Sequence, residues 1–271
     1  MAKAKKRKVS PPLRVLYVSS EAFPLIKTGG LADVSHTLPN ALAELGVDIR
    51  VLLPAYRAVL QQVEDLQILG WLDLGALGET RVLQAYHPEF QMPIWLVDHA
   101  GLFDREGNPY LDPNGRDWHD NPMRFSAFSK AAALMGIDAL GMGWRPGVVH
   151  AQDWQAALTH AFLAQEGHSP RRIYTIHNLA YDCQFNYAQF QALRLPPHWW
   201  SMENGILRAV FNAEGRPGVQ RRNHYGQSDL CRGDLYSRVW LWLYQYSAAR
   251  PRKTQRDSEW YRYAAVGPRQ G

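Results

Sequence analysis

A short loop near the amino terminus combines residues that suit an anionic ligand. Lys27 supplies a mobile cation, and Gly29 and Gly30 let the backbone approach a ligand closely because glycine lacks a side chain. A helix-like segment follows, and its first N–H groups and positive dipole end favour negative charge. The loop therefore suits a phosphate or a sugar oxygen, although it matches neither common glycine-rich nucleotide motif. A glycine pair is also common in ordinary turns, and that alternative stays open.

Two further loops carry side chains that suit sugar chemistry. Asp153 could orient a hydroxyl or stabilise positive charge that develops on a sugar, and Trp154 could stack on a pyranose ring. His177 ends another strand-like segment and offers two ring nitrogens to a hydroxyl. Each residue also has a structural alternative. Asp153 could be a helix N-cap, Trp154 could pack in the core, and His177 could be a buried ring with its hydrogen bonds satisfied.

The segments around the first loop predict a strand, a helix and a second strand. Residues 13–18 are β-rich, apolar residues recur every three or four positions over 31–45, and 47–53 form another apolar run. Pro39 should kink the helix or start its second half, since proline lacks the N–H that the helix needs. Gly46 should end the helix as a C-cap.

The same alternation continues along the chain and predicts the fold class. It is typical of a parallel sheet with helices on both faces, so we expect an α/β fold with a Rossmann-like, doubly wound, mainly parallel sheet. Ligands of such sheets bind beyond the carboxyl ends of the strands, where the three loops should converge. The further predicted strands are 92–98, 147–151 and 171–177, and the further predicted helices are 125–135 and 154–166.

Composition indicates a soluble cytoplasmic protein. The chain has 271 residues, 46% of them hydrophobic, and no run approaches the roughly 18 apolar residues that a membrane helix needs. The two cysteines, Cys183 and Cys231, match no metal or redox spacing, which favours a reducing compartment. Residues 1–12 are basic without an apolar core, so we expect a disordered leader rather than a secretory signal.

The positive charge of the chain is unevenly distributed. Residues 204–271 contain 12 Lys or Arg against 5 Asp or Glu, a net charge of +7, so residues 1–203 carry −2 of the overall +5. The basic balance therefore belongs to the last segment and to the short leader, whose Lys5–Lys8 run we interpret as a solvated tail. No nucleic-acid partner and no membrane partner are expected.

Longer motifs resemble one enzyme family. The runs SSEAFPLIKTGGLADV, RVLLPAY, FDREGNPYLD with DWHDNPMRF, VVHAQDWQ and TIHNLAY have the order and spacing found in bacterial glycogen synthases and plant starch synthases. The resemblance covers residues 13–200, and KTGGLADV is highly specific to the family. It implies a two-domain enzyme, of which residues 13–203 form the first Rossmann-like domain.

The resemblance also implies a reaction. The family transfers glucose from ADP-glucose to the 4-hydroxyl at the non-reducing end of an α-1,4-glucan such as glycogen, and it retains the anomeric configuration. An oxocarbenium-like transition state needs a nearby carboxylate, and a leaving diphosphate needs cations and N–H donors. The family needs no metal and no cofactor beyond its donor substrate, which agrees with the lack of an Asp-x-Asp run in this sequence.

Motif matching carries the family's site onto this chain. Asp153 would support the reaction centre and His177 would contact the transferred glucose, so these two are the expected catalytic residues. The expected substrate-binding residues, which line the donor cleft or lie near it, are Lys27, Gly29, Gly30, Asp33, Tyr110, Trp154 and Asn178.

Two positions depart from the family pattern. Gln152 stands where the family usually has histidine. Residues 181–185 replace the usual Tyr-Gln-Gly-x-Phe, and Cys183 stands in place of its glycine. That loop's backbone should differ, because glycine tolerates dihedral angles that cysteine does not.

The family pattern stops near Glu203, and a shifted reading frame explains why. Read one base later, residues 227–235 can encode SPTYAEEI, the following residues CTPEFGYG, and residues 259–263 NGID, which are the family's own continuation in order. We therefore expect residues 204–271 to be a poorly packed out-of-frame tail. The family's second domain, with most ADP-glucose contacts, would then be missing.

Three functions remain to be compared. The first is a glycogen synthase by descent, truncated and inactive in this form. The second is a non-catalytic α-glucan-binding remnant that holds glucan weakly through surface aromatic residues. The third is a two-domain glycosyltransferase with another donor, which KTGGLADV followed by HAQDWQ and TIHN disfavours.

The frame hypothesis makes a direct prediction about the gene. Resequencing across the codons for Trp199 to Gly205 should reveal an inserted or deleted base, after which the family's motifs follow in a single frame. Independent reads with an unbroken frame, together with a well-packed tail in the purified protein, would contradict the hypothesis.

Overall fold

A seven-stranded sheet forms the centre of the structure, a computed structural model that describes residues 11–167, 170–178, 187–194 and 197. The leader up to residue 10, the loop 181–185 and the tail 204–271 lie outside the described residues. The strands are β1 (Arg14–Val18), β2 (Asp48–Pro54), β3 (Glu64–Asp73), β4 (Glu79–Tyr86), β5 (Ile94–Asp98), β6 (Val148–Gln152) and β7 (Arg171–Thr175).

The sheet is mainly parallel, which confirms the predicted fold class. Its order is β3-β4-β5-β2-β1-β6-β7, and the five strands from β5 to β7 run parallel to one another. After β1 and its neighbour β2, the chain forms the edge strand β3 and comes back through β4 to β5, which lies beside β2. It then crosses to the other side of β1 to form β6 and β7. The strand order therefore reverses between β1 and β6, where a doubly wound sheet opens a crevice.

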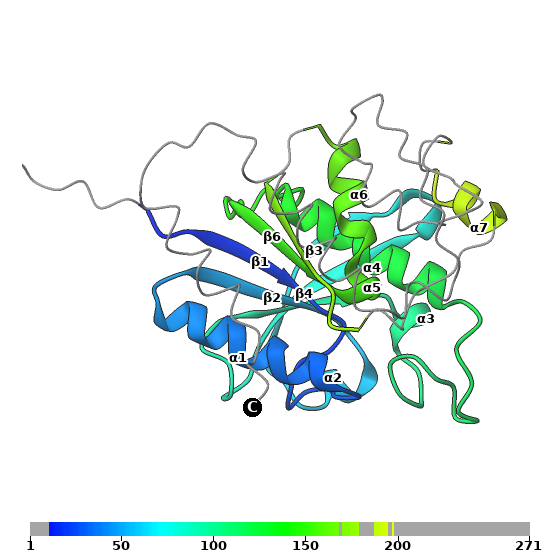
Figure 1. Ribbon diagram of the computed structural model, residues 1–271, viewed down its shortest axis with the longest axis horizontal. Helices are drawn as coiled ribbons and strands as arrows, with labels where there is room; N and C mark the ends of the chain where they lie inside the picture. The colour runs from blue at the N-terminus through cyan, green and yellow to red at the C-terminus, as the bar shows by residue number, and fades with distance from the viewer. Residues whose placement is uncertain (1–10, 168–169, 179–186, 195–196, 198–271) are drawn as a thin grey trace, which may run out of the picture. The chain divides into compact units, whose positions relative to one another are not determined.

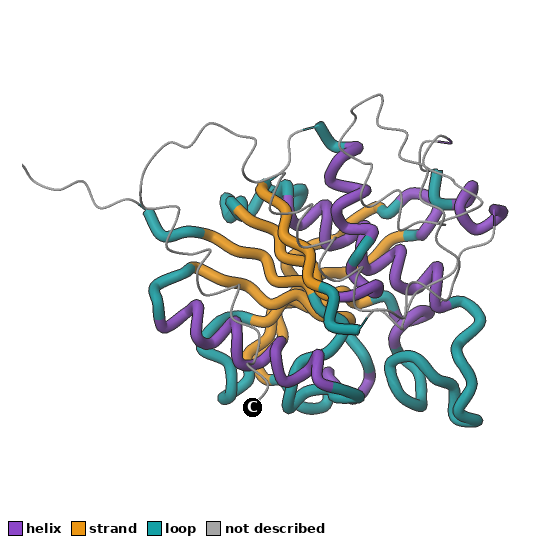
Figure 2. The backbone as a smooth tube through the Cα atoms, in the orientation of Figure 1, coloured by secondary structure: helices purple, strands orange, loops and turns teal. Residues whose placement is uncertain are grey.

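Helices cover both faces of the sheet. The longer ones are α1 (Gly30–Glu44), α4 (Asn121–Gly136) and α6 (Leu158–Gln165), and α1 lies on the opposite side from the other two (Figure 1). Helix α4 packs against α6 and against the short α5 (Asp153–Ala156). Figure 2 shows the strands enclosed between these helical layers. The remaining short helices are α2 (Arg57–Leu60), the 3-10 turn Gly75–Leu77, α3 (Ala100–Phe103) and α7 (Tyr187–Ala192).

Helix α1 is ended by Gly46 as the sequence predicted, and Pro39 lies inside the helix. The helix continues through Pro39, which is buried, so proline does not start a second helix. Gly46 has a positive φ of 83°, and the N–H groups of Gly46 and Val47 donate to the carbonyls of Ala43 (2.9 Å) and Leu42 (3.1 Å). This pair of bonds is a Schellman motif, so Gly46 ends the helix as expected.

Two parts of the structure differ from the predicted elements. The antiparallel pair β3 and β4 had no predicted counterpart, because β3 is an edge strand whose residues are nearly all exposed and show no buried face. The predicted helix 154–166 is divided in two, since Ala157 separates α5 from α6.

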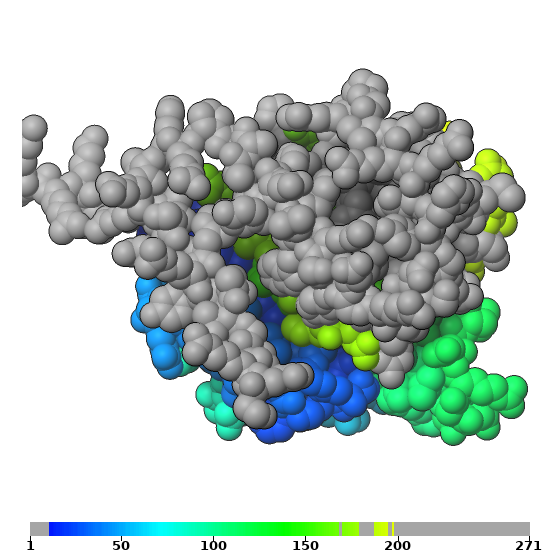
Figure 3. Space-filling view, in the orientation of Figure 1, coloured from blue at the N-terminus to red at the C-terminus, as the bar shows by residue number. Residues whose placement is uncertain are grey.

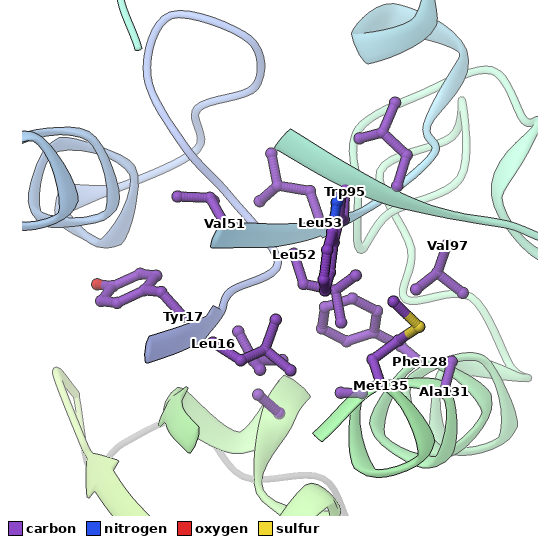
Figure 4. Close-up of a cluster of buried hydrophobic side chains, with 14 of the residues drawn as sticks. Leu16, Tyr17, Val51, Leu52, Leu53, Trp95, Val97, Phe128, Ala131 and Met135 are labelled. Atoms are coloured by element: carbon purple, nitrogen blue, oxygen red, sulfur yellow. The ribbon is translucent and has the colours of Figure 1, made fainter. Parts of the chain in front are cut away.

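The main core lies between the sheet and helix α4. Phe128, Ala131 and Met135 occupy one face of α4, and all three are essentially inaccessible to solvent. They face buried side chains of the central strands, among them Leu16 and Leu52 (Figure 4). This packing fixes the strands whose ends carry the loops of interest, because a close-packed core tolerates little displacement.

Two histidines, His160 and His150, are held neutral by the fold. His160 of α6 is 5% exposed, and its Nε2 lies 2.9 Å from the carbonyl oxygen of Ile173. Burial lowers the pKa of His160 to about 4, and it lowers the pKa of His150 on β6 to about 3. Protonation of either ring inside the fold is therefore unfavourable above these values.

The lowered pKa of His160 predicts a pH-dependent stability. The unfolded chain takes up a proton near pH 6.5 and the folded chain only near pH 4, so the free energy of unfolding should fall as the pH drops between these values. Each such histidine contributes up to about 1.4 kcal/mol per pH unit in this window. Denaturant unfolding of wild type and His160→Gln at several pH values measures the slope.

Gln is a suitable replacement because its amide nitrogen can donate to Ile173 in place of the ring. The variant should lose part of the pH slope between pH 6.5 and 4. Equal slopes in the two proteins would show that His160 does not control the acid sensitivity.

Candidate active site at the carboxyl ends of three parallel strands

Three of the predicted loops leave the same edge of the sheet. Strand β6 pairs with β1 in parallel up to Val18 and Ala151, and with β7 up to Gln152 and Thr175, so all three strands end together. Figure 3 shows yellow-green surface from the end of β7 beside blue surface from the amino-terminal segment. The predicted convergence of the loops is confirmed for the described residues.

A buried glutamate, which sequence reasoning missed, organises the first loop. Glu21 is 2% exposed and its carboxyl oxygens accept four hydrogen bonds. The donors are the N–H of Thr28 (2.5 Å), the hydroxyl of Thr28 (2.7 Å), the N–H of Gly29 (3.3 Å) and the hydroxyl of Tyr110 (2.5 Å). A buried carboxyl group must be hydrogen-bonded, so Glu21 holds this loop in one shape. An acidic residue shortly after a buried apolar strand was the signal that could have identified it.

The glycine pair leaves open space at the start of helix α1. Gly29 has a φ of −152°, Gly30 is the first helical residue, and a Cβ added to either would meet no atom within 4 Å. Neither glycine is therefore required by a left-handed turn or by packing against described atoms. Glu21 accepts the N–H of Gly29, but among the described residues no side chain caps the N–H groups that follow it, so these groups can meet an anion.

Lys27 and Asp33 form an exposed ion pair beside this helix end. Lys27 Nζ lies 2.7 and 2.8 Å from the two carboxyl oxygens of Asp33, and both side chains are about half exposed. An exposed pair of this kind contributes little stability. Its geometry leaves the ammonium group at the surface.

Asp153 and His177 meet at the ends of β6 and β7. The N–H of His177 donates to Asp153 Oδ1 at 2.6 Å, and Asp153 does not cap its own helix, because Gln152 occupies the N-cap position without a side-chain bond. The N-cap alternative is therefore wrong. Asp153 is only 8% exposed, and burial raises the pKa of its carboxyl group despite the opposing bonds from His177 and Asn178.

The backbone of Asp153 is strained. Its φ is +52°, in the left-handed region that residues with a side chain rarely adopt. Strain of this kind persists only where the surroundings impose it, and it is concentrated at functional sites.

The ring of His177 is partly buried. It is held by Gln152, the residue that stands where the family usually has histidine. His177 Nε2 lies 2.9 Å from Oε1 of Gln152, whose side chain is fully buried. One ring nitrogen of His177 therefore has a structural hydrogen bond, as the alternative interpretation expected. This bond fixes the orientation of the ring beside Asp153.

Tyr110 and Trp154 connect the two groups of residues. The hydroxyl of Tyr110 donates to Glu21 and accepts from Ser20 at 2.9 Å. Burial and the nearby Tyr56 and Glu21 raise the pKa of Tyr110 well above its ordinary value. The ring of Trp154 packs 4.9 Å from Phe125 and 6.1 Å from Tyr110, which supports the core-packing alternative for Trp154. Asn178 is exposed at the edge of the described region.

These contacts define two linked clusters rather than one. The first cluster consists of Glu21, Tyr110 and the glycine loop, residues 27–30. The second cluster consists of Gln152, Asp153 and His177. The charge of Glu21 contributes to the raised pKa of Asp153, so the clusters lie within electrostatic range of each other. Among the described residues, no group of three or more His, Cys, Asp or Glu side chains is placed to hold a metal ion. No helix in that part of the chain is both long and apolar enough to cross a membrane.

Known proteins resemble this chain over the same region. The starch synthase catalytic domain model matches residues 14–212. Glycogen synthase 1 of Methylococcus capsulatus is 46% identical over 191 residues, which cover 70% of this chain and 38% of that protein. A glycogen synthase of Thioalkalivibrio sulfidiphilus is 47% identical over 190 residues, or 69% of this chain and 39% of that protein.

A solved structure agrees with these relatives. The catalytic domain of starch synthase IV from Arabidopsis thaliana, bound to ADP and acarbose, matches with a TM-score of 0.56 and 26% identity. The match covers 68% of this chain and 38% of that one. This chain thus spans about two fifths of the length of the relatives it matches. The chain belongs to the starch synthase catalytic domain family of glycosyltransferases.

Proposed function

We propose that this chain carries the first domain of a glycogen synthase, a soluble cytoplasmic enzyme that transfers glucose from ADP-glucose to an α-1,4-glucan with retention. The observation that carries the proposal is the pair Asp153 and His177 at the strand-order reversal, beside an uncapped helix end with two open glycines. Family membership and the ligands of the Arabidopsis relative support the substrate classes.

Each part of the site would have a defined task. The glycine loop and Lys27 would receive the negative charge of the donor's diphosphate, which grows as the diphosphate leaves. Asp153 would stabilise the positive charge that develops on the transferred glucose, and His177 would orient that sugar through a hydroxyl. Asp33, Tyr110, Trp154 and Asn178 would complete the walls of the cleft.

The site would need a second domain to work. In the two-domain arrangement that the family resemblance implies, most contacts to ADP-glucose come from the second half of the enzyme. A cleft between two domains also excludes water only when both are present. We therefore propose that residues 13–203 are the first domain and that this 271-residue chain alone lacks activity.

The first prediction concerns the purified 271-residue chain. It should incorporate no measurable glucose from labelled ADP-glucose into glycogen, because it spans only about two fifths of the length of the relatives it matches. The assay is run beside Methylococcus glycogen synthase 1, which serves as the positive control. Robust incorporation by the short chain would contradict the proposed two-domain site.

Glucan binding without catalysis is the second candidate function. Trp71 of β3 is 55% exposed, and exposed aromatic rings can stack on sugars. Native gels containing glycogen test this: retardation of the inactive chain that disappears in Trp71→Ala would favour a glucan-binding remnant. Migration identical to that in plain gels would exclude it.

A second prediction of the proposed function tests Asp153 in an active chimeric enzyme. A chimera in which this chain's segment replaces the matching 191 residues of Methylococcus glycogen synthase 1 should transfer glucose. In that chimera Asp153→Asn should lower kcat about 100-fold or more with a smaller change in KM, because the lost charge acts mainly in the transition state.

The matched control is Asp104→Asn, which removes an exposed carboxylate that pairs with Arg57 at 2.7 Å and belongs to neither cluster. The control should keep the activity of the parent chimera. An Asp153→Asn chimera with more than a third of the parent's kcat would remove Asp153 from the reaction centre.

A further inference from the structure

Arg124 of helix α4 is a buried cation without a carboxylate partner. Its side chain is 1% exposed, and no ion pair joins it to an Asp or Glu among the residues that the structure describes. The nearby Asp120 is instead held by both terminal nitrogens of Arg105, at 2.8 and 2.6 Å. A buried guanidinium is costly unless its N–H groups are hydrogen-bonded, so its partners show what it holds in place.

The partners of Arg124 lie in the loop that carries Tyr110 or in the helices on either side of that loop. Arg124 Nη1 donates to the carbonyl oxygen of Pro109 at 3.0 Å and to Asn121 Oδ1 at 2.7 Å, and Nε donates to the carbonyl oxygen of Leu102 at 2.7 Å. The amide of Asn121 in turn donates to the carbonyl oxygen of Tyr110 at 2.9 Å. The carbonyl groups directly before and after the Tyr110 side chain are therefore both fixed by this pair.

Aromatic rings enclose the guanidinium. Its Cζ lies 5.6 Å from the ring centre of Phe103, 5.5 Å from that of Phe125 and 6.0 Å from that of Trp118. Rings at these distances attract a cation through their negative faces. They also exclude water, which strengthens the hydrogen bonds that Arg124 makes.

Tyr110 is in turn connected to the glycine loop by hydrogen bonds. Its hydroxyl donates to the carboxyl group of Glu21, which itself accepts from the N–H groups of Thr28 and Gly29. One connected set of hydrogen bonds thus runs from helix α4 to the start of helix α1. The relay consists of Arg124, Asn121, Tyr110 and Glu21.

We infer that Arg124 is a positioning residue for the donor-binding glycine loop, which it holds through the relay. The inference rests on the proposed function for the meaning of that loop, but the coupling itself is a property of the folded chain. Lysine cannot replace Arg124, since an ammonium group lacks the planar fork that reaches three acceptors on two sides.

Amide hydrogen exchange in the full 271-residue chain, without any nucleotide sugar, tests the coupling. Folded Arg124→Lys should exchange the Thr28 and Gly29 amides at least about tenfold faster than wild type, because Tyr110 no longer fixes Glu21. Asn121→Ala provides a second route if Arg124→Lys does not fold, and it should speed up the same two amides.

Two further variants separate the relay from general destabilisation. Leu83→Ala on β4 removes a buried side chain away from the relay, and it should lower Tm without a selective change at Thr28 and Gly29. Tyr110→Phe cuts the relay at its centre, so adding Arg124→Lys or Asn121→Ala to it should produce no further increase.

Unchanged exchange at Thr28 and Gly29 in the folded relay variants would overturn the inference, as would an equal increase in Leu83→Ala. Because the measurement uses no substrate, it is independent of the glucosyl-transfer assays. A chimera that fails to transfer glucose, together with intact coupling in the 271-residue chain, would remove only the proposed function. A chimera with normal transfer, together with no coupling in the chain, would remove only the role of Arg124.

Discussion

The carboxyl group of Glu21 is the constraint on which the rest of the site depends. It lies inside the protein directly after the first strand, where an unpartnered carboxyl group would be strongly unfavourable. Four donors satisfy it, and three of them come from Thr28 and Gly29. The loop that opens helix α1 is therefore shaped by the need to solvate one acidic group, and its two glycines remain open to a ligand.

The fourth donor joins segments that are far apart in the sequence. Tyr110 comes from the loop before α4, which is 89 residues from Glu21, and its ring also approaches Trp154 at the start of α5. The site is thus assembled from the ends of β1, β6 and β7 and from one long loop, around the point where the strand order reverses. A doubly wound sheet provides this convergence without further elements.

The second cluster results from the pairing of two neighbouring parallel strands. Parallel pairing of β6 with β7 places Gln152 opposite Thr175, so the residues that follow, Asp153 and His177, must lie close together. Asp153 takes a left-handed backbone conformation and a buried position, and its carboxyl group accepts a hydrogen bond from the β7 loop. The raised pKa of its carboxyl group is a consequence of that burial.

The sequence by itself determined the local elements, the loops that follow β1, β6 and β7, and the family to which they belong. Apolar periodicity and glycine positions are local properties, so the βαβ pattern and the Gly46 helix end could be read without a structure. Only the tertiary structure decided how the side chains are paired. The partner of Asp153, the burial of Glu21 and Arg124, and the antiparallel β3–β4 edge depend on contacts between distant segments, and these leave little periodic signal in the sequence.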